Sequence, residues 1–78
     1  MQYFVYMLRC SDGSYYTGIT TDLEKRIESH NNGVASKYTS PRRPVELVFH
    51  ERCNDKSSAT KREMEIKKLS RTEKEWLF

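Results

Sequence analysis

Hydrophobic positions along the chain form short runs, and their spacing predicts strands in three places. Residues 3–10 are β-prone and apolar at both odd and even positions, which is typical of an inner strand covered on both faces. Turn-forming residues at 11–14 separate this run from a second β-prone run at 15–20, so the two runs predict a hairpin. The third predicted strand covers residues 45–51.

Helix start and stop signals predict one helix after the hairpin. Residues 21–24, Thr-Asp-Leu-Glu, match a capping box, in which the Thr hydroxyl and the Glu carboxylate bond free backbone amides. Gly33 follows two asparagines and is a typical helix end, so we expect the helix from about residue 22 to about residue 32. Residues 34–44 contain Ser, Thr, prolines and two adjacent arginines, which predicts a connector with one short helical turn and a basic tip.

Two further helices are predicted towards the end of the sequence. Residues 54–55 offer caps for a helix over about 56–69, and a second capping box at 70–73 starts a short last helix. We expect the apolar residues 76–78 to lie on the domain. The predicted order is strand, strand, helix, strand, helix, helix. This order is typical of an α+β fold, in which a small three-stranded antiparallel sheet is flanked by helices, and residues 1–78 are enough for a single domain.

Composition places the chain among folded domains with a mildly basic surface. Lys and Arg outnumber Asp and Glu by 14 to 11, and the net charge of +3 helps to hold phosphates but is ordinary for a cytosolic protein. No apolar run approaches the ~20 residues that span a bilayer, and no signal-type segment opens the sequence, so we expect a cytoplasmic protein without membrane association. Cys10 and Cys53 are the only cysteines and are expected to be reduced thiols at small core positions.

Two polar residues of the first predicted helix share one face. Arg26 and His30 are four residues apart, beside the apolar stripe of Leu23 and Ile27, so both side chains can face one cleft. The spacing by itself favours an ordinary explanation, in which the Arg26 stem covers apolar surface and His30 interacts with the negative end of the helix dipole. Other evidence is needed to give the pair a function.

Glu63 lies on the predicted inner face of the next helix. Ala59, Glu63 and Ile66 follow helical spacing, which places the Glu63 carboxylate towards the sheet. An unpaired buried carboxylate is costly, so Glu63 needs a metal, a hydrogen-bond cluster, or an ion pair with Arg26 or a lysine. Glu65, on the opposite flank with basic neighbours, belongs to a solvated charged face.

The predicted hairpin is rich in tyrosine and contains one glycine inside a strand. The tyrosines are Tyr3, Tyr6, Tyr15 and Tyr16. Gly18 interrupts the second strand where a side chain is expected, and a strand glycine often marks the close approach of another group. Tyrosines in a small sheet usually pack in the core or at its rim, with the hydroxyl reaching water.

These residues stand in a recognisable arrangement. Phe4-Val5-Tyr6 and Tyr16-Thr17-Gly18 occupy the places of the tripeptides GIY and YIG, and the sequence resembles the GIY-YIG nuclease superfamily, specifically its small single-domain bacterial proteins. The first tripeptide keeps the tyrosine and differs in the two residues before it. The resemblance runs from residue 3 to about residue 69. Further matching segments are Gly18 to Leu23, Arg26, His30-Asn31, Lys37-Tyr38-Thr39, Pro44, and Ala59 to Lys67.

The resemblance implies a nuclease site and assigns its residues. Tyr6 and Tyr16 correspond to the catalytic tyrosines, and Arg26 corresponds to the residue that contacts the phosphate. Glu63 corresponds to the ligand of a divalent metal, which agrees with its inward position. His30 is similar to a helix residue that assists the water-activating tyrosine in some members.

Such a site requires both tyrosines on one face of the hairpin. A two-residue turn at Asp12-Gly13 would send Tyr6 and Tyr16 to opposite faces. A three-residue loop with Gly13 in the left-handed region, or a bulge, shifts the register by one residue and brings Tyr6, Tyr16 and Gly18 together. We therefore predict this irregular turn.

The implied chemistry is metal-dependent cleavage of DNA, as in DNA repair or processing. We expect Mg²⁺ or Mn²⁺ on Glu63, held weakly because one carboxylate leaves most of the hydration shell in place, and bound only with substrate. We expect a monomer, and so small a surface predicts activity that is weak, nonspecific or dependent on a protein partner. Candidate phosphate contacts outside the site are Lys37, Arg42, Arg43 and Lys67.

Three alternatives remain open at this point. The first is a nucleic-acid-binding module that keeps the fold without turnover. The second is a structural zinc domain that uses Cys10, His30, His50 and Cys53, in which only the last two residues form a close sequence pair. The third is a protein-interaction domain that docks through the aromatic end at residues 76–78.

Overall fold

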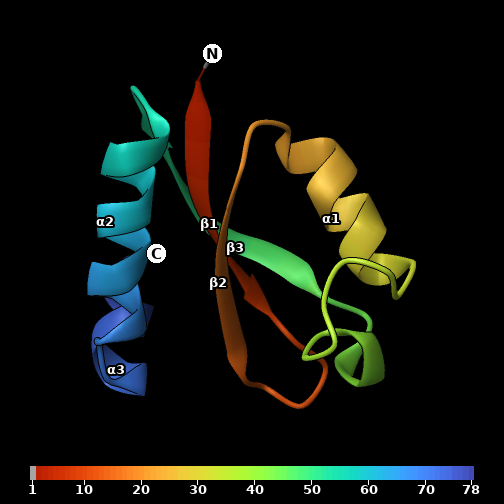
Figure 1. Ribbon diagram of the computed structural model, residues 1–78. Coiled ribbons are helices and arrows are strands. Elements are labelled where there is room, and N and C mark those ends of the chain that lie inside the picture. Colours follow the sequence, from red (N-terminus) through yellow and green to blue (C-terminus); the bar gives the residue numbers. More distant parts are fainter. Residues whose placement is uncertain (1) are drawn as a thin grey trace.

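The computed structural model describes residues 2–78, which form a sheet with α1 on one face and α2 and α3 on the other (Figure 1). The elements in chain order are β1 (Tyr3–Arg9), β2 (Tyr15–Thr20), α1 (Leu23–Asn31), the 3₁₀ helix η1 (Ser40–Arg42), β3 (Glu46–Cys53), α2 (Lys56–Lys67) and α3 (Arg71–Glu75). The predicted order of strands and helices is confirmed, as is the α+β class. Among the described residues, no helix has the length and apolar character needed to cross a membrane.

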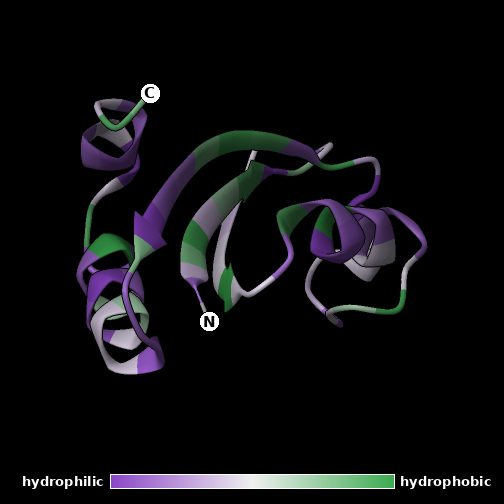
Figure 2. Cartoon of the chain, turned by 90° about the horizontal axis from the view of Figure 1, so that it is seen from above, coloured by the Kyte–Doolittle hydropathy of each residue, from purple (hydrophilic) through white to green (hydrophobic). Residues whose placement is uncertain are grey.

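The sheet is antiparallel with strand order β2-β1-β3, so β1 is the inner strand predicted from its apolar pattern. Val5 and Met7 are buried on the face covered by α2, whereas Tyr6 and Leu8 are buried on the face covered by α1. Figure 2 shows hydrophobic positions concentrated in the strands, between helices that are mostly hydrophilic. Two small cores therefore form, one on each face of β1.

The loop between β1 and β2 has the irregular form predicted from the sequence. Gly13 adopts a φ of +85°, and its amide donates to the Cys10 carbonyl oxygen at 2.9 Å. A side chain is disfavoured at this φ, which explains the glycine. The resulting register pairs Tyr6 with Gly18 and places Tyr16 in the same apolar cluster as Tyr6. Both tyrosines therefore lie on the α1 face of the sheet.

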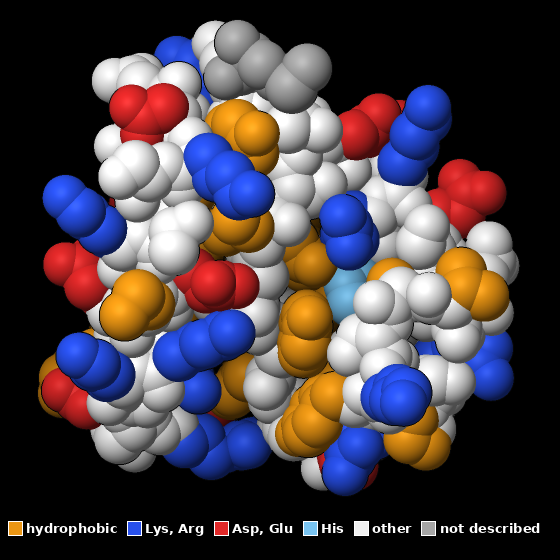
Figure 3. All heavy atoms as spheres, in the orientation of Figure 1, with side chains coloured by type: hydrophobic (Ala, Val, Ile, Leu, Met, Phe, Trp, Pro, Cys, Tyr) orange, Lys and Arg blue, Asp and Glu red, His pale blue; other side chains and the backbone are white. Residues whose placement is uncertain are grey.

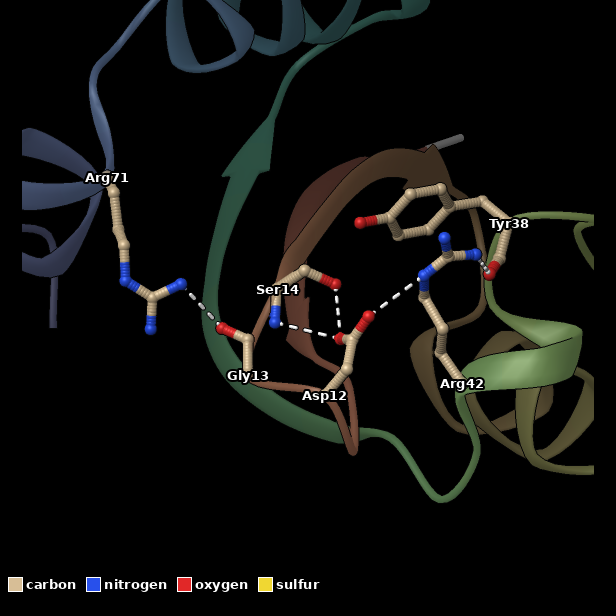
Figure 4. Close-up of polar contacts among 6 residues, drawn as sticks. All are labelled: Asp12, Gly13, Ser14, Tyr38, Arg42 and Arg71. Carbon is tan, nitrogen blue, oxygen red and sulfur yellow. Dashed lines mark hydrogen bonds and ion pairs between the residues drawn. The ribbon is translucent and has the colours of Figure 1, made fainter.

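The tip of this hairpin is bound from both sides (Figure 4). The Asp12 carboxylate accepts hydrogen bonds from the amide and hydroxyl of Ser14 at 3.0 and 2.6 Å, and from Nε of Arg42 at 3.0 Å. From α3, Nη1 of Arg71 donates to the Gly13 carbonyl oxygen at 2.7 Å. The turn between the first two strands is thus tied to the connector before β3 and to the last helix.

Helix α1 starts one residue later than expected, because Asp22 and not Thr21 is its N-cap. Oδ1 of Asp22 accepts a hydrogen bond from the Lys25 amide at 3.1 Å. The predicted capping box with Thr21 was therefore wrong. An aspartate is at least as good an N-cap as a threonine. The helix ends at Asn31, and Gly33, with a φ of +80°, carries the chain away from it as predicted.

Two other boundaries differ from the prediction. Strand β3 begins at Glu46, one residue later than expected, and runs to Cys53, two residues further than expected. Val45 lies outside the strand because its amide and carbonyl groups bond the Asn31 side chain, at 2.8 and 3.2 Å. Helix α2 begins as predicted and ends at Lys67, two residues early.

The chain end covers part of the α2 core. The predicted capping box at the start of α3 is confirmed. Leu77 packs against the core beneath α2, and the Phe78 ring lies edge-on to Tyr15 with 5.9 Å between ring centroids. Trp76 is 77% exposed, so only two of the three residues expected to lie on the domain do so.

Candidate active site

A buried hydrogen-bond chain joins β1, α1 and the connector. The Tyr6 hydroxyl lies 2.9 Å from Nε2 of His30, and Nδ1 of His30 lies 2.8 Å from the Thr39 hydroxyl oxygen. Tyr6 is 1% exposed, and His30 and Thr39 are 0% exposed. Leu23 and Ile27 pack α1 onto the Tyr6 cluster, which brings His30 in the last turn over the middle of β1.

Gly18 provides the space for the Tyr6 ring. It is the cross-strand partner of Tyr6, and a Cβ built at residue 18 would lie 2.6 Å from the Tyr6 hydroxyl oxygen and 2.8 Å from Cζ. Real Cβ contacts are longer than this, so a side chain at residue 18 would displace the tyrosine. The glycine inside β2 therefore has the close-approach role that its position suggested.

Tyr16 forms the wall between the buried chain and the surface. Its ring centroid lies 5.1 Å from that of His30 and 6.5 Å from that of Tyr6. On the outer side Tyr38 stacks on Tyr16 with centroids 6.1 Å apart, and the Arg42 guanidinium lies 4.1 Å from the Tyr38 ring centroid. Tyr16 is only half-buried and lines an open hollow at the surface.

The electrostatic environment keeps both partners of the central hydrogen bond neutral. Burial, reinforced by the nearby Tyr16 and Glu63, raises the pKa of Tyr6 well above its usual value, and the Arg26 charge opposes this shift. Burial and then the Arg26 charge lower the pKa of His30. Arg26 on α1 and Glu63 on α2 therefore both act on the Tyr6 hydroxyl, although they belong to different layers.

Glu63 points inward, as its helical spacing predicted, and has a lysine as partner. Its side chain is 19% exposed, and Oε2 lies 3.6 Å from Nζ of Lys67, whose side chain is 55% exposed. This is one of the ordinary explanations that the sequence left open for an inward carboxylate. Such partly exposed pairs typically contribute ~0–1 kcal/mol, so a stronger cation can replace Lys67.

Glu63 offers a cation one carboxylate, without a ligand cluster around it in the described part of the chain. Residues 2–78 contain no group of three or more His, Cys, Asp or Glu side chains arranged to hold a metal ion. A single carboxylate suits Mg²⁺ or Mn²⁺, which prefer oxygen ligands and retain several waters. Glu63 is the residue that would hold such an ion.

The zinc alternative is wrong for the described part of the chain, because its four residues do not converge. Both ring nitrogens of His30 have hydrogen-bond partners, Tyr6 and Thr39. The free thiols of Cys10 and Cys53 belong to different cores, on opposite faces of the sheet.

The basic residues expected to bind phosphate have different surroundings. Arg42 is bonded to Asp12 and donates to the Tyr38 carbonyl oxygen at 2.8 Å. Arg43 donates to backbone carbonyl oxygens of Ser40 and Asn31, at 2.7 and 3.3 Å. Both arginines therefore hold the connector in place.

Lys37 and Lys67 line two different hollows. Lys37 is exposed at a hollow lined by residues 33–37 and Ser40. Lys67 borders an open hollow of about 280 Å³. The other residues that line the Lys67 hollow are Tyr15, Tyr16, Thr17, Tyr38 and Lys74. Figure 3 shows one face of the molecule, where a strip of hydrophobic side chains has Lys and Arg side chains on both borders and an acidic side chain on one of them.

Two connector residues belong to the site although the sequence gave them no role there. Thr39 contacts His30, and Tyr38 stacks on Tyr16. The only signal in the sequence was that Lys37-Tyr38-Thr39 resembles the corresponding segment of the small single-domain GIY-YIG proteins. A threonine between a tyrosine and a serine carries no local pattern that predicts full burial.

Comparisons with known proteins match nearly the whole chain. The sequence model described as the GIY-YIG catalytic domain matches residues 2–75. The chain is 53% identical over 73 residues to a UPF0213 protein of Staphylococcus saprophyticus, covering 94% of this chain and 89% of that protein. It is also 53% identical over 74 residues to a UPF0213 protein of Halobacterium salinarum, covering 95% and 96% of the two chains.

Two solved structures are similar to this fold. The solution NMR structure of a UPF0213 protein from Bacillus halodurans is 47% identical, with a TM-score of 0.63 over 99% of this chain and 82% of that chain. The solution NMR structure of a protein from E. faecalis is 44% identical, with a TM-score of 0.67 over 97% of this chain and 81% of that chain. These likenesses cover both tyrosine strands and the helices around them.

Proposed function

Because the chain belongs to the GIY-YIG catalytic domain family, we propose that it is a divalent-metal-dependent nuclease that hydrolyses phosphodiester bonds of DNA. One observation carries the proposal: the Tyr6 hydroxyl is buried against His30 and lies within the fields of Arg26 and Glu63. A packing tyrosine in a small sheet usually directs its hydroxyl to water. The buried contact of the Tyr6 hydroxyl with His30, together with the opposing effects of Arg26 and Glu63 on its pKa, supports a role in proton transfer.

In the proposed reaction Tyr6 is the base that activates water. Its oxygen takes a proton from the attacking water while its own proton passes to Nε2 of His30, at 2.9 Å. The water oxygen forms a bond to phosphorus, the ester P–O bond breaks, and the leaving oxygen takes a proton from solvent. Coupling the two transfers avoids a free phenolate, which the raised pKa of Tyr6 opposes, and forms instead an imidazolium that burial and Arg26 disfavour.

Arg26 and Tyr16 are assigned to the phosphate. The Arg26 side chain is exposed, so its guanidinium can reach a bound phosphodiester and stabilise the charge that develops during attack. Tyr16 is half-buried beside His30 and holds the water or a phosphate oxygen in line with Tyr6. These roles fit the exposure of the two residues, since Arg26 is exposed and Tyr16 is half-buried.

Glu63 is the residue proposed to hold the cation. Bound Mg²⁺ or Mn²⁺ would neutralise charge on the phosphate and lower the pKa of a coordinated water. Such a cation would compete with Lys67 for the Glu63 carboxylate, and Lys67 borders the hollow next to Tyr16. We propose that the released Lys67 then contacts the DNA backbone.

The surface around the site is suited to a phosphate backbone rather than to reading bases. Lys67 and Lys74 line the hollow, and Arg42 and Arg43 add fixed positive charge on the connector. Lys37 is exposed in a separate hollow and serves as an outlying phosphate contact. We propose that the protein acts as a cytoplasmic monomer in DNA repair or processing, with a protein partner supplying substrate selection.

A nucleic-acid-binding module without turnover is the second candidate. The ion pair of Lys67 with Glu63 and the high pKa of Tyr6 are what such a module would also show. Metal-dependent cleavage separates the two functions, because binding through basic side chains needs no divalent cation.

The test is cleavage of labelled single-stranded, duplex and branched DNA in Mg²⁺, Mn²⁺ or EDTA. Glu63→Gln is compared with Glu65→Gln, a matched change on the same helix at a side chain that is 67% exposed and paired with Arg62. Cleavage that requires the cation and is lost only in Glu63→Gln supports the nuclease. DNA binding without cleavage by the wild type, at any cation concentration, would favour the binding module.

A further inference from the structure

Thr39 is placed as a helix cap but does not act as one. It is the N-cap residue of η1, where a threonine hydroxyl ordinarily accepts a hydrogen bond from a backbone amide, yet its side chain makes no capping bond. The hydroxyl is instead fully buried, 2.8 Å from Nδ1 of His30 and 3.4 Å from the Ser36 carbonyl oxygen. The structure thus directs this hydroxyl to the histidine.

The direction of the buried chain follows from the hydrogens that its groups can donate. The Ser36 carbonyl can only accept, so the Thr39 hydroxyl donates to it. The Thr39 oxygen then accepts a hydrogen from Nδ1 of His30, and the bare Nε2 accepts the hydrogen of the Tyr6 hydroxyl. This arrangement places one hydrogen in each of the three contacts.

The reverse direction satisfies fewer groups. If Thr39 donated to Nδ1, then Nε2 would carry the hydrogen and donate to Tyr6. The Ser36 contact would be lost. The Tyr6 hydroxyl, whose one hydrogen-bond partner among residues 2–78 is Nε2 of His30, would then accept a hydrogen and have no acceptor for its own. The lowered pKa of His30 supports a neutral ring with a single N–H.

We infer that Thr39 is a positioning residue that fixes His30 in the tautomer protonated at Nδ1, and so leaves Nε2 free to accept the Tyr6 proton. Its importance for catalysis rests on the proposed nuclease function, whereas the tautomer itself does not. With the hydrogen on Nε2, His30 could not take a proton from Tyr6, and the coupled transfer from water would stop at the tyrosine.

The tautomer can be read directly from long-range ¹H–¹⁵N NMR spectra of the two histidine rings in ¹⁵N-labelled protein. The wild type and Thr39→Ser, which keeps the hydroxyl, are expected to show the His30 hydrogen on Nδ1. Thr39→Val, which keeps the shape and removes the hydroxyl, is expected to shift it towards Nε2. The exposed His50 ring is an internal control whose spectrum should not change.

Each outcome bears on the inference. A hydrogen on Nε2 in the wild type overturns it, even if Thr39→Val fails to fold. A folded Thr39→Val variant that keeps the Nδ1 tautomer also overturns it.

Cleavage and DNA binding of the same variants test the catalytic part. Thr39→Val is expected to cleave DNA at least tenfold more slowly with unchanged DNA affinity, and Thr39→Ser is expected to restore the rate. A shifted tautomer with an unchanged rate would overturn the positioning role. The Nδ1 tautomer in a wild-type protein that cleaves no DNA would overturn the nuclease proposal and confirm the placement of the hydrogen.

Discussion

The Tyr6 ring lies against the backbone of Gly18, so close that a Cβ at residue 18 would be 2.6 Å from the tyrosine oxygen. The two residues face each other across β1 and β2, and the Tyr6 hydroxyl is hydrogen-bonded to His30. The position of the proposed base therefore depends on the absence of a side chain from its neighbour in the sheet.

Gly18→Ala is expected to lower the free energy of unfolding by about 1–3 kcal/mol, because the added methyl group must displace a buried ring. Urea unfolding measures the loss. In a Tyr6→Leu background, where the contacting ring atoms are gone, the same substitution should cost much less. Equal costs in the two backgrounds would show that Tyr6 is not what excludes a side chain at residue 18.

Much of this arrangement could be predicted from the sequence. The double-sided apolar pattern of residues 3–10 predicts an inner strand, and the requirement for Tyr6 and Tyr16 on one face predicts the left-handed Gly13. Helical spacing predicts the inward carboxylate of Glu63. The inner strand and the inward carboxylate depend on local periodicity, which the sequence contains, whereas the Gly13 turn was predicted from the resemblance to a family whose site needs both tyrosines on one face.

Other features depend on a choice between two suitable neighbouring residues or on contacts between distant residues. Asp22 replaces Thr21 as the cap because both side chains are suitable acceptors and the backbone selects between them. Thr39 and Tyr38 join the site only because the connector folds back over α1 and β2. Arg42 and Arg43 bind the protein's own backbone carbonyls. Two adjacent arginines in a sequence do not show whether they bind the backbone or a phosphate.

The depressed pKa of His30 predicts a loss of stability in mild acid. Burial and Arg26 disfavour the imidazolium, so below pH ~6.5 the unfolded chain takes up a proton that the folded chain does not. The free energy of unfolding should therefore fall as the pH decreases from about 7 to about 5. Urea unfolding at both pH values measures the effect.

The matched controls for this pH effect are His30→Gln and His50→Gln. The first removes the buried group and should reduce the pH dependence, whereas the second removes an exposed histidine and should leave it unchanged. An undiminished pH dependence in His30→Gln would contradict the assignment.

Lys67→Met is expected to strengthen cation binding at Glu63, because the lysine occupies the carboxylate in the free protein. A partly exposed ion pair of this kind corresponds to a change of up to about fivefold in affinity. Titration with Mn²⁺, followed by electron paramagnetic resonance, measures the change. Lys68→Met removes the same charge from the adjacent residue and is the control, and equal Mn²⁺ affinities in the two variants would exclude competition by Lys67.

Arg71→Ala is expected to loosen the attachment of α3 to the hairpin. The guanidinium donates to the Gly13 carbonyl oxygen and lies 5.0 Å from the Tyr15 ring centroid. Loss of these partly exposed contacts should lower the free energy of unfolding by up to about 1 kcal/mol and speed hydrogen exchange at the hairpin tip. Arg52→Ala, at an exposed position of β3, should change neither quantity. Unchanged exchange in Arg71→Ala would show that the contact does not hold the turn.

The most direct test of the proposed base is single-turnover DNA cleavage by Tyr6→Phe, with Tyr3→Phe as a matched change on the same strand but in the other core. Tyr6→Phe is expected to reduce the cleavage rate by at least about 10²-fold, the usual contribution of a general base, with the fold and DNA affinity retained. Tyr3→Phe should cleave at nearly the wild-type rate. A folded Tyr6→Phe variant that cleaves as fast as the wild type would contradict the assignment of Tyr6.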